Sequence, residues 1–177
     1  MTKALGRRLT WLGALAGLGG CGFQPVYMPT SSGKAGVAQR ELAAVYVGII
    51  PDRPGQVLRQ ALQERLGNDS GTPANYDLRV TFGIAGEGIG IEQDTIATRV
   101  RLSGTASWTL TARDAKKTVL ATGSARAMDG VNIIDAQYFA SDLEVEAEEA
   151  RMAQNLATQI ATRLATWFRQ QAAKQTG

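Results

Sequence analysis

The chain has 177 residues, of which 44% are hydrophobic and 20% are charged, and its formal net charge is +3 at pH 7. Lys3, Arg7 and Arg8 account for that excess, because the other 16 of the 19 basic residues balance the 16 acidic residues. This balance gives no electrostatic reason to bind nucleic acid. The chain has no histidine and one cysteine, Cys21, which excludes Ser-His-Asp and Cys-His catalysis, the common Cys/His zinc sites and an internal disulfide.

Residues 1–20 have the three-part layout of a secretory signal peptide: a basic start, an apolar run from Leu9 to Leu18 and small residues before Cys21. The run is too short to span a bilayer, which takes roughly 20 apolar residues in a helix. We therefore predict that residues 1–20 are cleaved. An ordinary signal peptide with an incidental cysteine is the alternative.

The sequence Leu18-Gly19-Gly20-Cys21 resembles the lipobox of bacterial lipoproteins. The resemblance implies that Cys21 becomes the acylated N-terminus, and acyl chains hold a protein firmly on a bilayer. Gly22 follows the cysteine, whereas inner-membrane lipoproteins of Gram-negative bacteria tend to have Asp there. The resemblance thus implies a periplasm-facing protein of the cell outer membrane, anchored in its lipid through Cys21.

Residues 21–40 are rich in proline, serine and glycine and show no apolar periodicity, which predicts a flexible tether. We predict one domain over residues 41–177. It should begin with a strand over residues 43–50, which are apolar and partly β-branched and are followed by Pro51. A helix from Pro54 to Leu66 should follow, with Gly67 as its C-terminal cap, and then a loop over residues 68–74.

Alternating sequences predict two strands, over residues 76–84 and 98–111, each with one apolar and one polar face. A polar turn at residues 113–117 should join the second of these to a weaker antiparallel strand over residues 118–128. The polar face of the long strand carries Arg99, Arg101, Ser103, Thr105, Ser107 and Thr109. The interpretation without a functional role is that these residues simply face water, as one side of an antiparallel sheet often does.

Four glycines, Gly83, Gly86, Gly88 and Gly90, lack the spacing of a phosphate-binding loop, so we predict a flexible loop or bulge there. Residues 142–174 have a long helical pattern. Its glutamates gather near the start and its basic residues near the end, as the helix dipole favours, so the acidic run is interpreted as solvated rather than as a metal site. We expect no cofactor and no metal.

This order of elements predicts an α+β two-layer sandwich. Two helices should pack on one face of a small mixed, mainly antiparallel four-stranded sheet. The other face of the sheet should remain uncovered.

The segment Cys21-Gly22-Phe23-Gln24-Pro25-Val26-Tyr27 resembles the "CGFxPxY" start of lipopolysaccharide-assembly lipoproteins of the LptE family, in particular the alphaproteobacterial type. The first predicted helix resembles that of the family, in residues Gln56, Leu58, Arg59, Leu62 and Leu66. The resemblance implies two helices on a four-stranded sheet and a non-enzymatic role. It also implies that the protein assembles and plugs the outer-membrane barrel LptD and assists the insertion of lipopolysaccharide into the outer leaflet.

The resemblance also implies lipopolysaccharide binding through basic residues, since guanidinium groups pair well with phosphates. Candidates are Arg99, Arg101, Lys116, Lys117 and Arg126. The alternative for all five is ordinary solvation of a strand face and a turn.

Two other functions stay open at this point. One is an envelope scaffold or assembly lipoprotein without a lipopolysaccharide role. The other is a hydrolase acting on envelope glycan with two carboxylates, which would lie about 5–10 Å apart. Its acid pair would come from Asp77, Glu87, Glu92, Asp94, Asp114 and Asp129.

Overall fold

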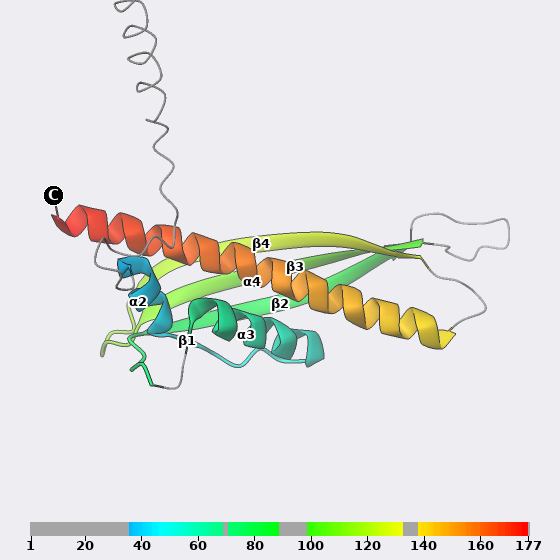
Figure 1. Ribbon diagram of the computed structural model, residues 1–177, viewed down its shortest axis with the longest axis horizontal. Helices are drawn as coiled ribbons and strands as arrows, with labels where there is room; N and C mark the ends of the chain where they lie inside the picture. The colour runs from blue at the N-terminus through cyan, green and yellow to red at the C-terminus, as the bar shows by residue number, and fades with distance from the viewer. Residues whose placement is uncertain (1–35, 69–70, 89–98, 133–137, 177) are drawn as a thin grey trace, which may run out of the picture.

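The computed structural model describes residues 36–68, 71–88, 99–132 and 138–176. In these residues four strands form one sheet in the order β1 (Val45–Val47), β2 (Tyr76–Gly88), β3 (Arg99–Ala112) and β4 (Val119–Asn132), as Figure 1 shows. β1 runs parallel to β2, and the other neighbours are antiparallel. The predicted signal peptide, Cys21 and most of the predicted tether lie outside the described residues.

Two helices, α3 (Arg53–Leu66) and α4 (Tyr138–Thr176), cover one face of this sheet (Figure 1). α3 starts with Pro54 in its first turn and ends at Gly67, whose φ of 65° is the left-handed conformation of a glycine cap. α4 buries a stripe of alternating large and small side chains, which includes Leu156, Ile160 and Leu164. The α+β two-layer sandwich predicted from the sequence is confirmed.

The N-terminal helix α2 (Val37–Ala43) was not predicted. The sequence analysis assigned residues 37–40 to the tether and Ala43 to the first strand, and that strand, β1, spans only Val45–Val47. Ala38 and Leu42, four positions apart, bury one side of α2, so the signal for a helix was present but short. After Gly48 the chain turns away from the sheet, and the next residue, Ile49, is 83% exposed.

The prediction of a flexible loop or bulge at the glycine-rich segment is wrong for residues 83–88. β2 continues through them, and Gly83, Gly86 and Gly88 pair in regular register with Thr105, Leu102 and Val100 of β3. Pairing with a long, strongly patterned partner strand overrides the low strand propensity of glycine. Gly90 lies outside the described residues.

Both outer strands of the sheet have backbone carbonyls that accept hydrogen bonds from helix or loop side chains. On β1, Asn68 Nδ2 donates to the Val45 carbonyl at 2.6 Å and Arg59 Nε donates to the Val47 carbonyl at 3.3 Å. On β4, Gln159 Nε2 donates to the Arg126 carbonyl at 3.0 Å, and Arg163 donates to that of Ser124. These bonds occupy groups through which another strand could add to the sheet.

No helix in the described part of the chain combines the length and the apolar character needed to span a bilayer.

Candidate interaction surface

The face of the sheet that α3 and α4 leave uncovered is called the open face. Strand alternation and the pairing register assign its residues, since neighbours along a strand point to opposite faces. From β2 it takes Asp77, Arg79, Thr81, Gly83, Ala85 and Glu87, from β3 Arg101, Ser103, Thr105, Ser107, Thr109 and Thr111, and from β4 Thr122, Ser124, Arg126, Met128 and Gly130. The polar face predicted for the long strand is thus observed from Arg101 onward, and the side chain of Arg99 is outside the described part.

Small and hydroxyl-bearing side chains fill the middle of the open face. Thr81, Gly83, Thr105, Ser107 and Ser124 are all exposed. Such a surface is flat and rich in hydrogen-bonding groups, and it offers little apolar area. It is suited to a wet, hydrogen-bonded contact with another polar surface.

Two of the predicted basic residues, Arg101 and Arg126, lie on this face. Arg126 donates from Nε and Nη2 to Ser103 Oγ at 3.3 and 3.2 Å. Arg101 lies two positions from Ser103 on β3, and its guanidinium pairs with the Glu87 carboxylate at 4.0 Å. Both arginines are exposed. The Arg101 side chain is 50% exposed and its ion pair is long, so its guanidinium is accessible to an anion.

Lys116 and Lys117 lie in the β3–β4 turn at the other end of the sheet. Thr118 shapes this turn by donating to the Asp114 carboxylate from its backbone N–H at 3.1 Å and from its hydroxyl at 2.9 Å. These hydrogen bonds, the backbone one first, lower the pKa of Asp114. From Arg101 to Ala112 the strand covers about 37 Å at roughly 3.4 Å per residue. The candidate residues therefore do not form one site.

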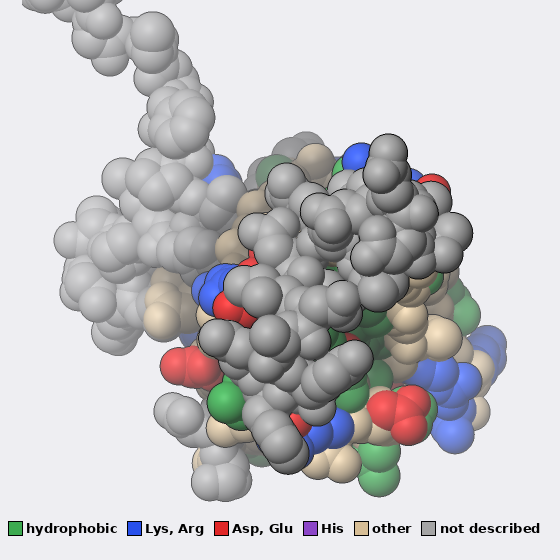
Figure 2. All heavy atoms as spheres, turned by 90° about the vertical axis from the view of Figure 1, so that its right-hand side faces the viewer, with side chains coloured by type: hydrophobic (Ala, Val, Ile, Leu, Met, Phe, Trp, Pro, Cys, Tyr) green, Lys and Arg blue, Asp and Glu red, His purple; other side chains and the backbone are tan. Residues whose placement is uncertain are grey.

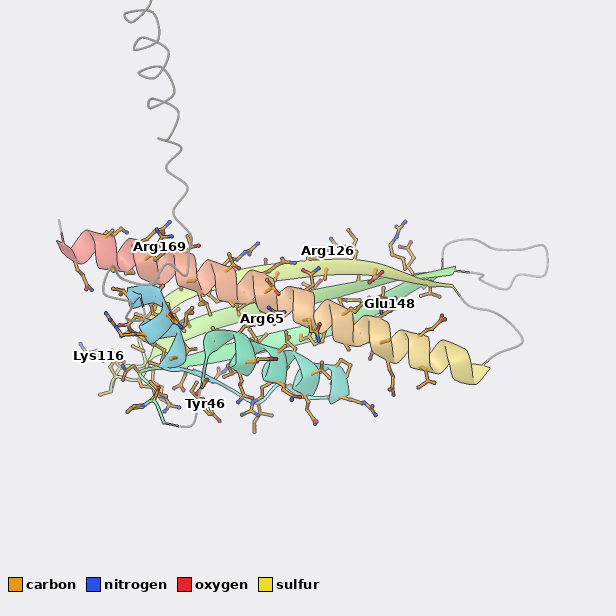
Figure 3. All side chains as sticks on the ribbon, in the orientation of Figure 1. Tyr46, Arg65, Lys116, Arg126, Glu148 and Arg169 are labelled. Atoms are coloured by element: carbon orange, nitrogen blue, oxygen red, sulfur yellow. The ribbon has the colours of Figure 1, made fainter. Side chains whose placement is uncertain are left out.

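A hollow of about 520 Å³ lies where the open face meets β1, and its lining includes Tyr46, Asp77, Arg79 and Lys117. Figure 3 labels Tyr46 at this end of the molecule. Arg113 lies over the Tyr46 ring at 4.9 Å and donates to Asp77 Oδ1 at 2.8 Å, which occupies the carboxylate. Because Arg113 pairs with Asp77, the side chains of Arg79 and Lys117 make the net charge of the hollow positive. Sequence analysis missed Tyr46, Arg79 and Arg113 as site residues, because only the register of β1, β2 and β3 brings them together.

The carboxylates considered for a hydrolase lie apart in different surroundings. Asp77 is held by Arg113, and Asp114 caps the β3–β4 turn. Glu87 pairs with Arg101, and Asp129 accepts from the N–H of Gly130 at 2.8 Å. Glu92 and Asp94 are outside the described residues. Each described carboxylate thus has a structural partner.

These features define a small α+β protein that presents a broad polar sheet face. Residues 42–164 match the LptE family, described as lipopolysaccharide-assembly, and the chain belongs to that family. It is therefore a lipopolysaccharide-assembly protein. No curated protein sequence matches it.

Solved structures share the fold. A protein from Caulobacter crescentus CB15 is 21% identical with a TM-score of 0.62, and the match covers 76% of this chain and 96% of that one. The minor lipoprotein of Acinetobacter baumannii is 16% identical with a TM-score of 0.55, covering 69% and 90%. The rare lipoprotein B of Shewanella oneidensis is 13% identical with a TM-score of 0.51, covering 75% and 98%. At these identities the likeness concerns the fold alone.

Proposed function

We propose that this protein is a non-enzymatic outer-membrane lipoprotein, acylated at Cys21, that docks its open face inside the barrel LptD. There it plugs the barrel, supports its assembly and assists the insertion of lipopolysaccharide into the outer leaflet. Family membership supports the lipopolysaccharide role. The observation that carries the docking proposal is the open face itself.

The chemistry of the open face fits the inside of a membrane barrel. Such barrels direct their apolar side chains to the lipid and their polar side chains to the lumen. A plug in that lumen needs hydrogen-bonding groups and a flat contour, which the threonines, serines and glycines of β2 and β3 provide. The helix-covered face and the capped sheet edges have their own intramolecular partners, which leaves the open face for this contact.

For lipopolysaccharide we propose two groups of basic residues. Arg101 and Arg126 are both exposed on the open face, where each guanidinium can pair with a phosphate. Lys117 and Arg79 line the hollow near Tyr46, and Lys116 is exposed in the same turn. Arg99 stays a candidate from sequence alone.

The first test is an affinity pull-down of the tagged full-length chain from solubilised envelopes, with Cys21→Ala beside it. Thr105→Trp places a large side chain in the middle of the open face, and Gln154→Trp places one on an exposed position of α4 as a control. We expect a stoichiometric outer-membrane barrel with the unaltered chain and with Gln154→Trp, and its loss with Thr105→Trp.

A barrel that still accompanies Thr105→Trp in full amount would contradict docking through the open face. If no barrel appears with the unaltered chain, even after crosslinking, the envelope-scaffold function takes its place. Lipopolysaccharide binding is tested separately on purified protein, where Arg101→Glu/Arg126→Glu should weaken binding and an equal affinity would remove this pair from the proposal.

A further inference from the structure

A second hollow, of about 560 Å³, lies at the end of the molecule where α2, the β3–β4 turn and the last turns of α4 meet, here called the basal end. Trp167 and Phe168 from α4 and Val119 and Leu120 from β4 form the apolar part of its wall, and the polar part includes Glu41, Gln171 and Gln175. Val37 and Val119 are 41% and 58% exposed. The two rings of α4 contact each other edge to face at 5.0 Å, and Trp167 is half-buried at the edge of the core.

Basic residues neighbour the lining residues of this hollow in the sequence. Lys116 is exposed in the turn that leads to Val119, Lys174 lies beside Gln175, Arg169 follows Phe168, and Arg40 precedes Glu41. Figure 3 labels Lys116 and Arg169 at this end of the molecule. The two acids closest by have protein partners, because Glu41 accepts from the Tyr76 hydroxyl at 2.8 Å and Asp114 accepts from Thr118. Aromatic and apolar side chains with basic side chains nearby are typical of a surface that rests on a membrane interface.

The opposite end of the molecule holds a cluster of glutamates, two of which pair with arginines, Glu146 with Arg53 and Glu148 with Arg151. The first turns of α4 hold Glu144, Glu146, Glu148 and Glu149, whereas no acidic residue follows Glu149 in the sequence. Figure 2, which looks onto this far end, shows acidic side chains on both sides of it, among some basic ones. The glutamates of α4 thus lie away from the basal end, and an anionic surface would attract the basic residues of that end.

The position of the predicted anchor agrees with this polarity. α2 begins at Val37, which lines the basal hollow, and Cys21 lies about 16 residues before it. A segment of that length has a typical end-to-end distance of roughly 20–24 Å. An acylated Cys21 would thus keep the basal end close to the bilayer.

We propose that the basal end docks on an anionic phospholipid surface, with Trp167, Val37 and Val119 at the interface and Lys116 and Lys174 against the headgroups. Docking would orient the domain, with its basal end on the bilayer and its acidic end pointing away. Lys116 is shared with the basic residues proposed for lipopolysaccharide, and the other residues of this surface do not depend on that role or on the barrel.

The test uses the chain from Gly22 to Gly177, which lacks the predicted signal peptide and the lipid but keeps every described residue. It is mixed with vesicles of phosphatidylcholine, with or without phosphatidylglycerol. Two tryptophans remain in this chain, and Trp108 is buried under α4, so a change in emission reports on Trp167. We expect binding to the anionic vesicles only, weakening with salt, and quenching of Trp167 by brominated lipid.

Lys116→Glu/Lys174→Glu should weaken binding by at least about twenty-five-fold, because each basic residue near the surface contributes roughly fivefold. Arg101→Glu/Arg126→Glu changes the net charge equally on the open face and should bind nearly as well as the unaltered chain. Absence of binding to anionic vesicles, an unquenched Trp167, or an equal loss in both variants would overturn the proposal.

Lipopolysaccharide vesicles separate this surface from the lipopolysaccharide role. If Arg101→Glu/Arg126→Glu loses affinity only for lipopolysaccharide, that site and the basal docking surface are distinct. If Lys116→Glu/Lys174→Glu loses affinity for lipopolysaccharide alone, the basal end is a lipopolysaccharide site and phospholipid docking is wrong.

Discussion

The two faces of the sheet are made by the same strands and differ in what fills them. On the helix-covered face, Leu78 and Leu110 are 0–1% exposed and share one apolar core with Leu156 of α4. On the open face, the neighbouring positions hold threonine, serine and glycine that face outward. The covered face supplies the stability of the free domain, and the open face contributes little to it. A side chain on the open face is therefore free to serve a partner.

The largest expected effect on the free energy of unfolding comes from truncating a buried side chain of α4 that packs on the covered face. Leu156→Ala should lower the free energy of unfolding by about 3 kcal/mol, since the fully buried side chain leaves a cavity between α4 and β3. Ser107→Ala on the open face is the matched control and should change it by less than about 0.5 kcal/mol. Urea unfolding monitored by circular dichroism measures both. Equal losses would mean that the open face is packed as tightly as the core.

Gly104 tests how closely α4 approaches the sheet. A Cβ at this position would lie 2.3 Å from Met152 Sδ and 3.4 Å from Leu156 Cδ1. Gly104→Ala should therefore destabilise the domain by about 1–3 kcal/mol through overpacking. Combining it with Met152→Ala, which removes the obstructing sulfur, should give a smaller loss than the sum of the two single changes. Strict additivity of the two losses would show that Met152 does not obstruct Gly104.

Tyr76 couples the covered face to α2. Its hydroxyl donates to the Glu41 carboxylate at 2.8 Å, and its ring contacts Phe168 at 5.1 Å. Tyr76→Phe keeps the ring and should cost about 1 kcal/mol at neutral pH, the usual net value of a hydrogen bond. Chemical denaturation of the two proteins at pH 7 checks this value.

The same residue predicts a dependence on alkaline pH. Burial, together with the hydrogen bond to Glu41 and its negative charge, raises the pKa of Tyr76 from 10.0 to about 12. Because the folded protein holds this proton more tightly than the unfolded chain, the stabilisation is complete below pH 10 and is lost as the pH rises toward 12. Absorbance titration should show one tyrosine that ionises late, absent in Tyr76→Phe. A normal titration of all tyrosines would contradict the contact with Glu41.

The periodicity of the sequence predicted those features of the fold that depend on local residue pattern alone. The alternation of β2 and β3 and the long stripe of α4 were sufficient for the α+β sandwich and for the polar face. α2 was missed because a seven-residue helix has only two buried positions, and Gly83 to Gly88 were misjudged because pairing with β3 decides their conformation. Strand register places Arg101 and Arg126 on one face and brings Tyr46, Arg79 and Arg113 to one hollow, and register is a property of the folded sheet.

The smallest expected effect on the free energy of unfolding comes from a substitution on the open face, and it is a stabilisation. Gly83 is paired with Thr105, and a Cβ there would meet nothing within 4 Å. Its backbone is not in the left-handed region, so Gly83→Ala should raise the free energy of unfolding by about 0.5 kcal/mol by restricting the unfolded chain. Thermal unfolding measured beside Gly104→Ala gives the contrast between glycines of two paired strands. A loss at Gly83 as large as that at Gly104 would mean that the open face is packed in the free protein, and docking through this face would then lose its basis.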